Sequence, residues 1–122
     1  MTKTQNSKHY DLEDRTLRFA KRIANYIDNL QKTISNVEIG KQLMRSAGSI
    51  GANYIEANES LSKKDFLMRI KISRKESKES RYWLQLSEPG INQGEKDDLI
   101  RESMELMKIF GSIVTKSQSL EN

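Results

Sequence analysis

Residues 42–83 constrain the fold most strongly, because they join a helix rich in small residues to a helix with a narrow, serine-lined face. The first of these helices contains Ala47, Gly48, Gly51 and Ala52 near its middle. Glycine inside a helix costs about 0.5–1 kcal/mol relative to alanine, so two glycines this close together indicate that a neighbouring helix approaches closely. The second helix has one face formed by Phe66, Ile70, Ser73, Ser77, Ser80 and Leu84. These positions follow helical spacing, so we expect the two helices to pack tightly together.

Four segments show helical periodicity, and each follows a capping residue with an acidic residue three positions later. The pairs are Asp11 with Asp14, Ser35 with Glu38, Ser62 with Asp65, and Asn92 with Glu95. They predict helices over about 12–31, 36–59, 63–87 and 93–119, and Pro89–Gly90 ends the third. In the first helix, the predicted core stripe is Leu17, Ala20, Ala24 and Ile27, flanked by Ile23 and Leu30.

The connections between these helices are short, which favours antiparallel neighbours. The sequence therefore predicts an all-α fold, an antiparallel up-down-up-down four-helix bundle, as a single domain over residues 11–122. Residues 1–10 are polar and have no period, so we expect a disordered or loosely docked N-terminal arm there.

The composition favours association of the chain with copies of itself. Hydrophobic residues make up 35% of the chain and charged residues 31%, which leaves little apolar side chain for a globular core. The fourth predicted helix nevertheless has apolar residues over more than half of its circumference, a wider stripe than one bundle needs. They are Leu99, Ile100, Met104, Leu106, Met107, Ile109, Phe110, Ile113 and Val114. We expect part of this surface to form a contact between subunits.

The residue inventory argues against catalysis. The chain has no cysteine, and its one histidine, His9, lies in the predicted arm. Di-iron bundle sites, thiolate metal sites and Ser-His-Asp or Cys-His catalysis are therefore not available. We expect no enzymatic activity, no cofactor and no metal. No apolar run is long enough to cross a bilayer, and the N-terminus lacks the apolar segment of a signal peptide, so we expect a cytoplasmic protein.

A polar line in the second predicted helix permits two interpretations. Arg45, Ser49, Asn53 and Glu56 recur at 4-4-3 spacing. They could contact a ligand or nucleic acid, or they could form a structural polar network where helices or subunits meet, with Arg45 and Glu56 in separate pairs. We favour the network. An enzyme that uses Arg45 and Glu56 is a more distant alternative.

The third predicted helix contains cations that we call the basic stripe: Lys64, Lys71, Arg74, Lys78 and Arg81. Such a row can follow a phosphate backbone, which also suits the net charge of +4, although a solvated lysine-rich face is the simpler explanation. Tyr82 and Trp83 could stack on bases. Because adjacent residues point to different sides of a helix, we instead place Trp83 on a second apolar strip with Ile72, which favours self-association.

The polar identities in residues 42–86 resemble those of a bacterial four-helix bundle family, the proteins encoded in intervening sequences of 23S ribosomal RNA genes. The residues that match its pattern are Arg45, Ser46, Ser49, Ile50, Asn53, Glu56, Lys64, Asp65, Phe66, Glu76, Glu79, Tyr82, Trp83 and Leu84. Ser73 and Ser77 stand where relatives often have alanine, and Arg74 stands where an apolar residue is common. These departures make the third helix more polar and more basic than is usual in the family.

The resemblance implies a helical bundle that assembles into a ring-like homo-oligomer, with a pentamer as the expected form. The chain is also similar to the accessory protein of diversity-generating retroelements, a basic pentamer that binds nucleic acid and a reverse transcriptase. No enzymatic activity is established for the family. The resemblance and the basic stripe together lead us to expect RNA or DNA as a partner, and a protein partner of the homo-oligomer is the alternative.

Overall fold

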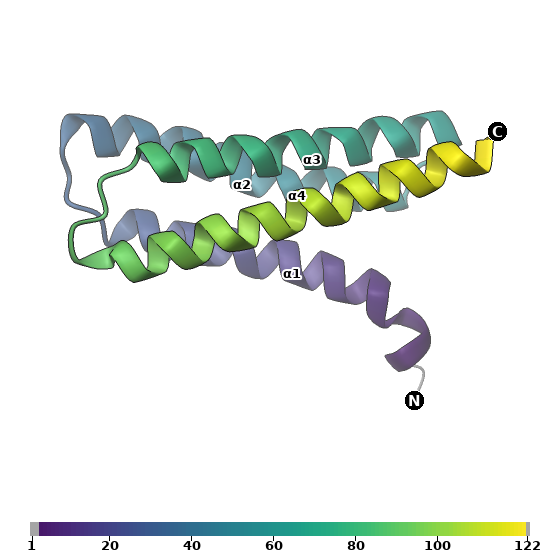
Figure 1. The fold of residues 1–122 in the computed structure, drawn as a ribbon, viewed down its shortest axis with the longest axis horizontal. Helices are drawn as coiled ribbons and strands as arrows, with labels where there is room; N and C mark the ends of the chain where they lie inside the picture. The colour runs from purple at the N-terminus through teal and green to yellow at the C-terminus, as the bar shows by residue number, and fades with distance from the viewer. Residues whose placement is uncertain (1–2, 122) are drawn as a thin grey trace.

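The computed structural model describes the backbone of residues 3–121 and the side chains of residues 12–119. It consists of four α-helices, α1 (Lys3–Asp28), α2 (Ile34–Asn58), α3 (Lys63–Leu86) and α4 (Gln93–Glu121), with a short 3-10 helix, η1 (Gly90–Asn92), before α4. No strand occurs over residues 3–121, so the predicted all-α class and the four helices are confirmed. Figure 1 shows the α1–α2 and α3–α4 connections at one end and the α2–α3 connection at the other. No helix in the described range has the length and apolarity needed to cross a bilayer.

The helix ends follow local chemistry, and two of them differ from the prediction. Helix α1 begins at Lys3, earlier than the start near residue 12 that the capping pattern predicted. The side chains of residues 1–11 lie outside the described set, and loose docking of this segment stays a prediction. Helix α2 is capped by Thr33 instead of Ser35, because the Thr33 hydroxyl accepts the backbone N–H of Asn36 at 3.1 Å. Ser62 caps α3 as predicted, and Gly90 turns the chain at φ +58°.

The core stripe of α1 is rotated from the predicted one. Leu17 is 52% exposed, whereas Ile23 and Leu30, which were expected to flank the stripe, are buried together with Leu12, Thr16, Phe19 and Tyr26. Both sets recur at helical spacing, and the observed set buries more apolar surface per residue, which stabilises this orientation of α1. The Tyr26 hydroxyl is hydrogen-bonded to that of Ser87 at 2.6 Å, and burial raises the pKa of Tyr26.

The predicted close packing of α2 against α3 is confirmed. The hydroxyls of Ser46 and Ser80 lie 2.8 Å apart, and Ser73 donates to the carbonyl of Ile50 at 2.9 Å. All three serines are fully buried, and Ile70 and Leu84 of α3 are buried beside them. Because these hydroxyls find partners inside the interface, the small side chains bring the two backbones together without leaving the serine hydroxyls unpaired.

The role predicted for the two glycines is confirmed only in part: a helix approaches Gly51 closely, but it is α1 and not α3, and no helix approaches Gly48. A Cβ on Gly51 would lie 2.9 Å from the Thr16 hydroxyl. The glycine therefore allows α1, and not α3, to approach α2 closely at this position. A Cβ on Gly48 would meet nothing within 4 Å, so this glycine faces outward. The α2–α3 contact therefore depends on Ser46, Ala47 and the α3 serines, and on neither glycine.

Candidate nucleic-acid interface

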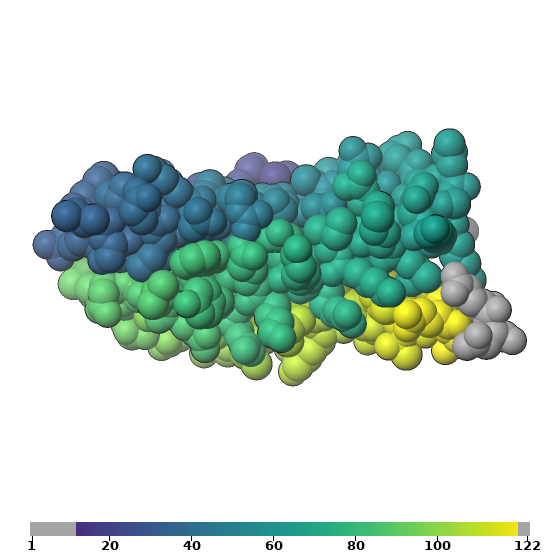
Figure 2. Space-filling model, turned by 90° about the horizontal axis from the view of Figure 1, so that it is seen from above, coloured from purple at the N-terminus to yellow at the C-terminus, as the bar shows by residue number. Residues whose placement is uncertain are grey.

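The basic stripe lies on the side of α3 that faces away from the core. Lys64, Lys71, Arg74 and Lys78 are exposed, and Arg81 is half-buried. None of the five forms an ion pair or a side-chain hydrogen bond within the described part of the chain. The stem of Arg74 passes α4 at Gly111, where an added Cβ would lie 3.8 Å from its Cδ. Figure 2 shows α2 and α3 side by side over one face of the molecule, with α4 along the edge beyond α3.

The structure adds two residues, Lys75 and Tyr82, to this surface. An α-helix has about 3.6 residues per turn, so positions 71, 75, 78 and 82 follow a single line along it. We call this line the outer row; its members are Lys71, Lys75, Lys78 and Tyr82, and all four are exposed. The 4-3-4 spacing was visible in the sequence, but the predicted basic stripe contained only cations at 7-3-4-3 spacing and included neither Lys75 nor Tyr82.

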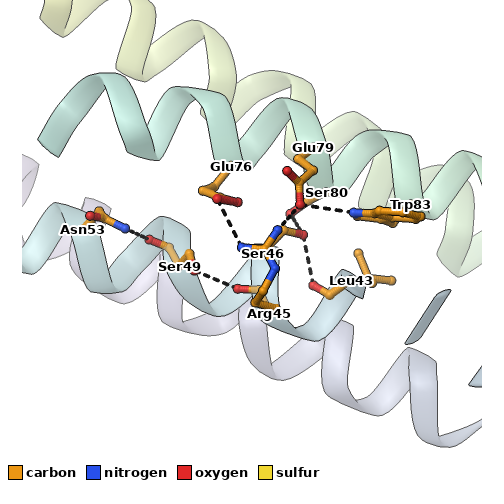
Figure 3. Close-up of polar contacts among 9 residues, drawn as sticks. All are labelled: Leu43, Arg45, Ser46, Ser49, Asn53, Glu76, Glu79, Ser80 and Trp83. Atoms are coloured by element: carbon orange, nitrogen blue, oxygen red, sulfur yellow. Dashed lines mark hydrogen bonds and ion pairs between the residues drawn. The ribbon is translucent and has the colours of Figure 1, made fainter. Parts of the chain in front are cut away.

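The carboxylates of mid-α3 point away from the outer row, toward α2. Arg45 of α2 pairs with Glu76, at 3.3 Å, and with Glu79. Trp83 donates its indole N–H to the same Glu79 carboxylate at 3.2 Å. Figure 3 shows Arg45 on α2 with both carboxylates directed at it from α3. The Glu76 side chain is only 7% exposed, and burial of a carboxylate is costly unless a cation lies beside it. Arg45 therefore keeps negative charge off the outer side of α3.

The other members of the polar line on α2 bond mainly to backbone. Ser49 donates to the carbonyl of Arg45 at 2.8 Å, and Asn53 donates to the carbonyl of Ser49 at 2.9 Å. Arg69 of α3 donates to the side-chain oxygen of Asn53 at 3.0 Å, which gives a second link between the helices. Glu56 is exposed, and its carboxylate has no partner within the described range. The structure thus brings Arg45, Ser49 and Asn53 together at the α2–α3 contact and leaves Glu56 outside it.

The arginines of α1 differ from the cations of α3 because each has a carboxylate partner. Arg15 forms two bonds to Glu102 of α4, at 2.6 and 2.8 Å, and Arg22 pairs with Glu95 at 3.0 Å. Hydrogen bonds to these carboxylates raise the pKa of Arg15 and of Arg22. Arg18 pairs with Asp14 of its own helix. The three arginines line a cleft between α1 and α4 together with Phe19 and Glu102. An anionic ligand in this cleft would have to displace the glutamates from the arginines, whereas a ligand on the outer side of α3 would displace no carboxylate.

The surface has the chemistry of a phosphate-binding face. Unpaired ammonium and guanidinium groups on a rigid helix attract a polyanion and release its counterions.

Across the described residues, no group of three or more acidic or histidine side chains is placed to hold a metal ion.

Comparisons with known proteins agree with this architecture. A family model described as 23S rRNA-intervening sequence protein matches residues 8–112. Among solved structures, the chain is similar to a protein with unknown function from the S23 ribosomal protein family of Bacteroides thetaiotaomicron, with a TM-score of 0.74 and 36% identity. The match covers 84% of this chain and 96% of that chain. Among curated proteins, no match is found.

Proposed function

The chain belongs to the family of 23S rRNA-intervening sequence proteins, and from this premise we propose that it is a non-enzymatic protein that binds RNA or DNA through the phosphate backbone. The basic stripe, Lys64, Lys71, Arg74, Lys78 and Arg81, supplies the phosphate contacts. The protein requires no cofactor for this role and acts in the cytoplasm.

One observation supports this proposal above the others. Four cations of the basic stripe are exposed and Arg81 is half-buried, and none of the five has a carboxylate partner among the described residues, while the glutamates of the same helix are bonded to Arg45. If the lysines served only solvation, they would not need to be separated from the glutamates. Exposed ion pairs between the two would then be expected, because such pairs stabilise a helix slightly. The separation of charges directly favours binding of a phosphate backbone, because each unpaired cation replaces a condensed counterion.

The salt dependence of binding tests the proposal. We expect the logarithm of the association constant to fall linearly with the logarithm of salt concentration, measured by fluorescence anisotropy with labelled strands. Replacing Arg74 and Lys78 by glutamine removes two phosphate contacts and makes the slope shallower by about 1.4–1.8. The matched control is the double variant of Lys21→Gln and Lys41→Gln, which removes the same charge from α1 and α2 and leaves the slope near that of the unmodified protein. Binding that is absent at physiological salt, or equal slopes for the two double variants, would refute the proposal.

We also propose that the helices form the antiparallel up-down-up-down bundle and that several copies assemble into a ring-like homo-oligomer, with five as the expected number. The arrangement of the connections in Figure 1 supports the first part. Partly exposed Ile100, Met104 and Met107 on α4 support the second, since they are apolar side chains that one copy leaves half-covered. Sedimentation equilibrium should give a mass that is a multiple of the 14.1 kDa chain. A particle that stays monomeric at high concentration would contradict the ring.

A second candidate function is docking of a protein partner by the homo-oligomer. A mostly apolar groove between α1 and α2, lined in part by Ile27, Val37, Gly40 and Met44, favours this alternative. Leu17 and Ile55, 52% and 51% exposed, add apolar surface on the same two helices. A stoichiometric protein partner that survives nuclease treatment and is lost when Val37 and Met44 become Asp would favour this candidate over nucleic-acid binding.

A further inference from the structure

Tyr82 is an exposed aromatic ring within a row of unpaired lysines. Its side chain is 56% exposed, and Lys78 lies one turn before it on the same side of α3, with Lys75 and Lys71 further along the outer row. Residues four apart on a helix have Cβ atoms about 5–6 Å apart, so a strand that contacts the Lys78 ammonium group also passes the tyrosine ring.

The ring of Tyr82 is supported from one side. It contacts Trp83 edge-on, with ring centroids 5.1 Å apart and planes at 74°. Trp83 is itself held by its indole hydrogen bond to Glu79, which is bonded to Arg45. Tyr82 therefore rests against a side chain fixed to α2, so it can offer a flat surface to a ligand with little further loss of side-chain entropy.

From this arrangement we propose that the outer row binds single-stranded nucleic acid and that Tyr82 stacks against one of its bases. The inference rests on the proposed phosphate-binding function and adds the class of ligand and a residue that contacts it. In a duplex, both faces of each internal base are covered by neighbouring bases, so a surface tyrosine can stack only on an unpaired one. Lysines that follow the phosphates together with an aromatic ring that stacks a base are the combination that single-strand binding surfaces use.

Strands that differ only in their bases test the proposal. The probes are oligouridine and oligothymidine of about 12 nucleotides, each with an abasic strand of equal length and charge, and a duplex of the same length. We expect the unmodified protein to bind the base-bearing strands more tightly than the abasic ones. Tyr82→Ala should weaken binding of the base-bearing strands about fivefold to 150-fold and leave abasic and duplex binding unchanged. A difference between oligouridine and oligothymidine would show that the row also responds to the sugar or to the thymine methyl group, and equal binding would mean that the row contacts only features common to the two strands.

Two variants control for general effects at this position. Tyr82→Phe keeps the ring and should bind like the unmodified protein, whereas Leu86→Ala removes an apolar side chain of similar exposure, 48%, one turn away and should change nothing. Equal affinity for base-bearing and abasic strands, or an unchanged affinity in Tyr82→Ala, would overturn stacking while the salt dependence still supported the phosphate contacts. Absence of binding to every strand would overturn both proposals.

Discussion

The two sides of α3 use similar numbers of polar residues for opposite purposes. The side that faces the bundle buries Ser73, Ser77 and Ser80 and directs Glu76 and Glu79 toward Arg45. The outer side exposes Lys71, Lys75, Lys78 and Tyr82, and none of the four forms an ion pair or a side-chain hydrogen bond among the described residues. On the inner side every hydroxyl is satisfied within the fold, so these polar groups contribute to stability. On the outer side the charges contribute little to stability and are available to a ligand.

The largest effect should come from removing an apolar side chain on the inner side. Ile70 is fully buried, and Ile70→Ala should lower the free energy of unfolding by about 2–5 kcal/mol, because it loses burial and leaves a cavity. Met68, 47% exposed on the other side of α3, is the matched control, and Met68→Ala should change stability by no more than about 0.5 kcal/mol. Urea denaturation followed by circular dichroism measures both, and similar losses for the two variants would contradict the assignment of sides.

A smaller effect should follow from removing the cation that holds the two glutamates. Arg45→Met leaves Glu76 buried without its partner, and we expect a loss of about 1–3 kcal/mol in the free energy of unfolding. Adding Glu76→Gln removes the uncompensated charge and should restore part of that loss. A double-mutant cycle by urea denaturation gives the coupling between the two residues, and a coupling near zero would mean that Arg45 does not hold Glu76.

The smallest effects come from the two glycines of α2, and they should have opposite signs. Gly51→Ala places a methyl group 2.9 Å from the buried Thr16 hydroxyl and should destabilise the protein by about 1 kcal/mol or more. Gly48→Ala meets open space and should stabilise it by about 0.5–1 kcal/mol, because alanine is the better helix former. Thermal denaturation of the pair measures the difference. Two shifts of the same sign would show that both glycines lie on the same kind of surface.

The sequence predicted the structural features that depend on helix geometry alone. The helix number, the Ser62 cap, the turn at Gly90 and the apolar and serine positions of α3 follow from spacing and local chemistry. The position of the basic stripe away from the core of α3 follows in the same way, since residues separated by three or four positions share a side wherever the helix packs.

The features that the sequence did not predict depend on which helix is the neighbour. Two glycines indicate a close approach but do not identify the helix that approaches, and Gly51 contacts α1. In α1 two stripes of residues have helical spacing. Packing of α1 against α2 and α4 determines that Phe19 is buried and that Leu17 is exposed. Arg45 and Glu76 are 31 positions apart, so their pairing becomes visible only when α2 and α3 lie side by side.

Lysine footprinting of the protein with and without bound oligothymidine tests the central claim most directly, because it locates the strand on the surface. Amine-reactive labelling read by mass spectrometry compares each lysine in the two states and does not depend on the number of subunits. We predict that Lys71, Lys75 and Lys78 become protected, while Lys21 and Lys41, which lie on α1 and α2, react equally in both states. Protection confined to lysines outside α3, or no protection at a strand concentration that saturates binding, would contradict the account.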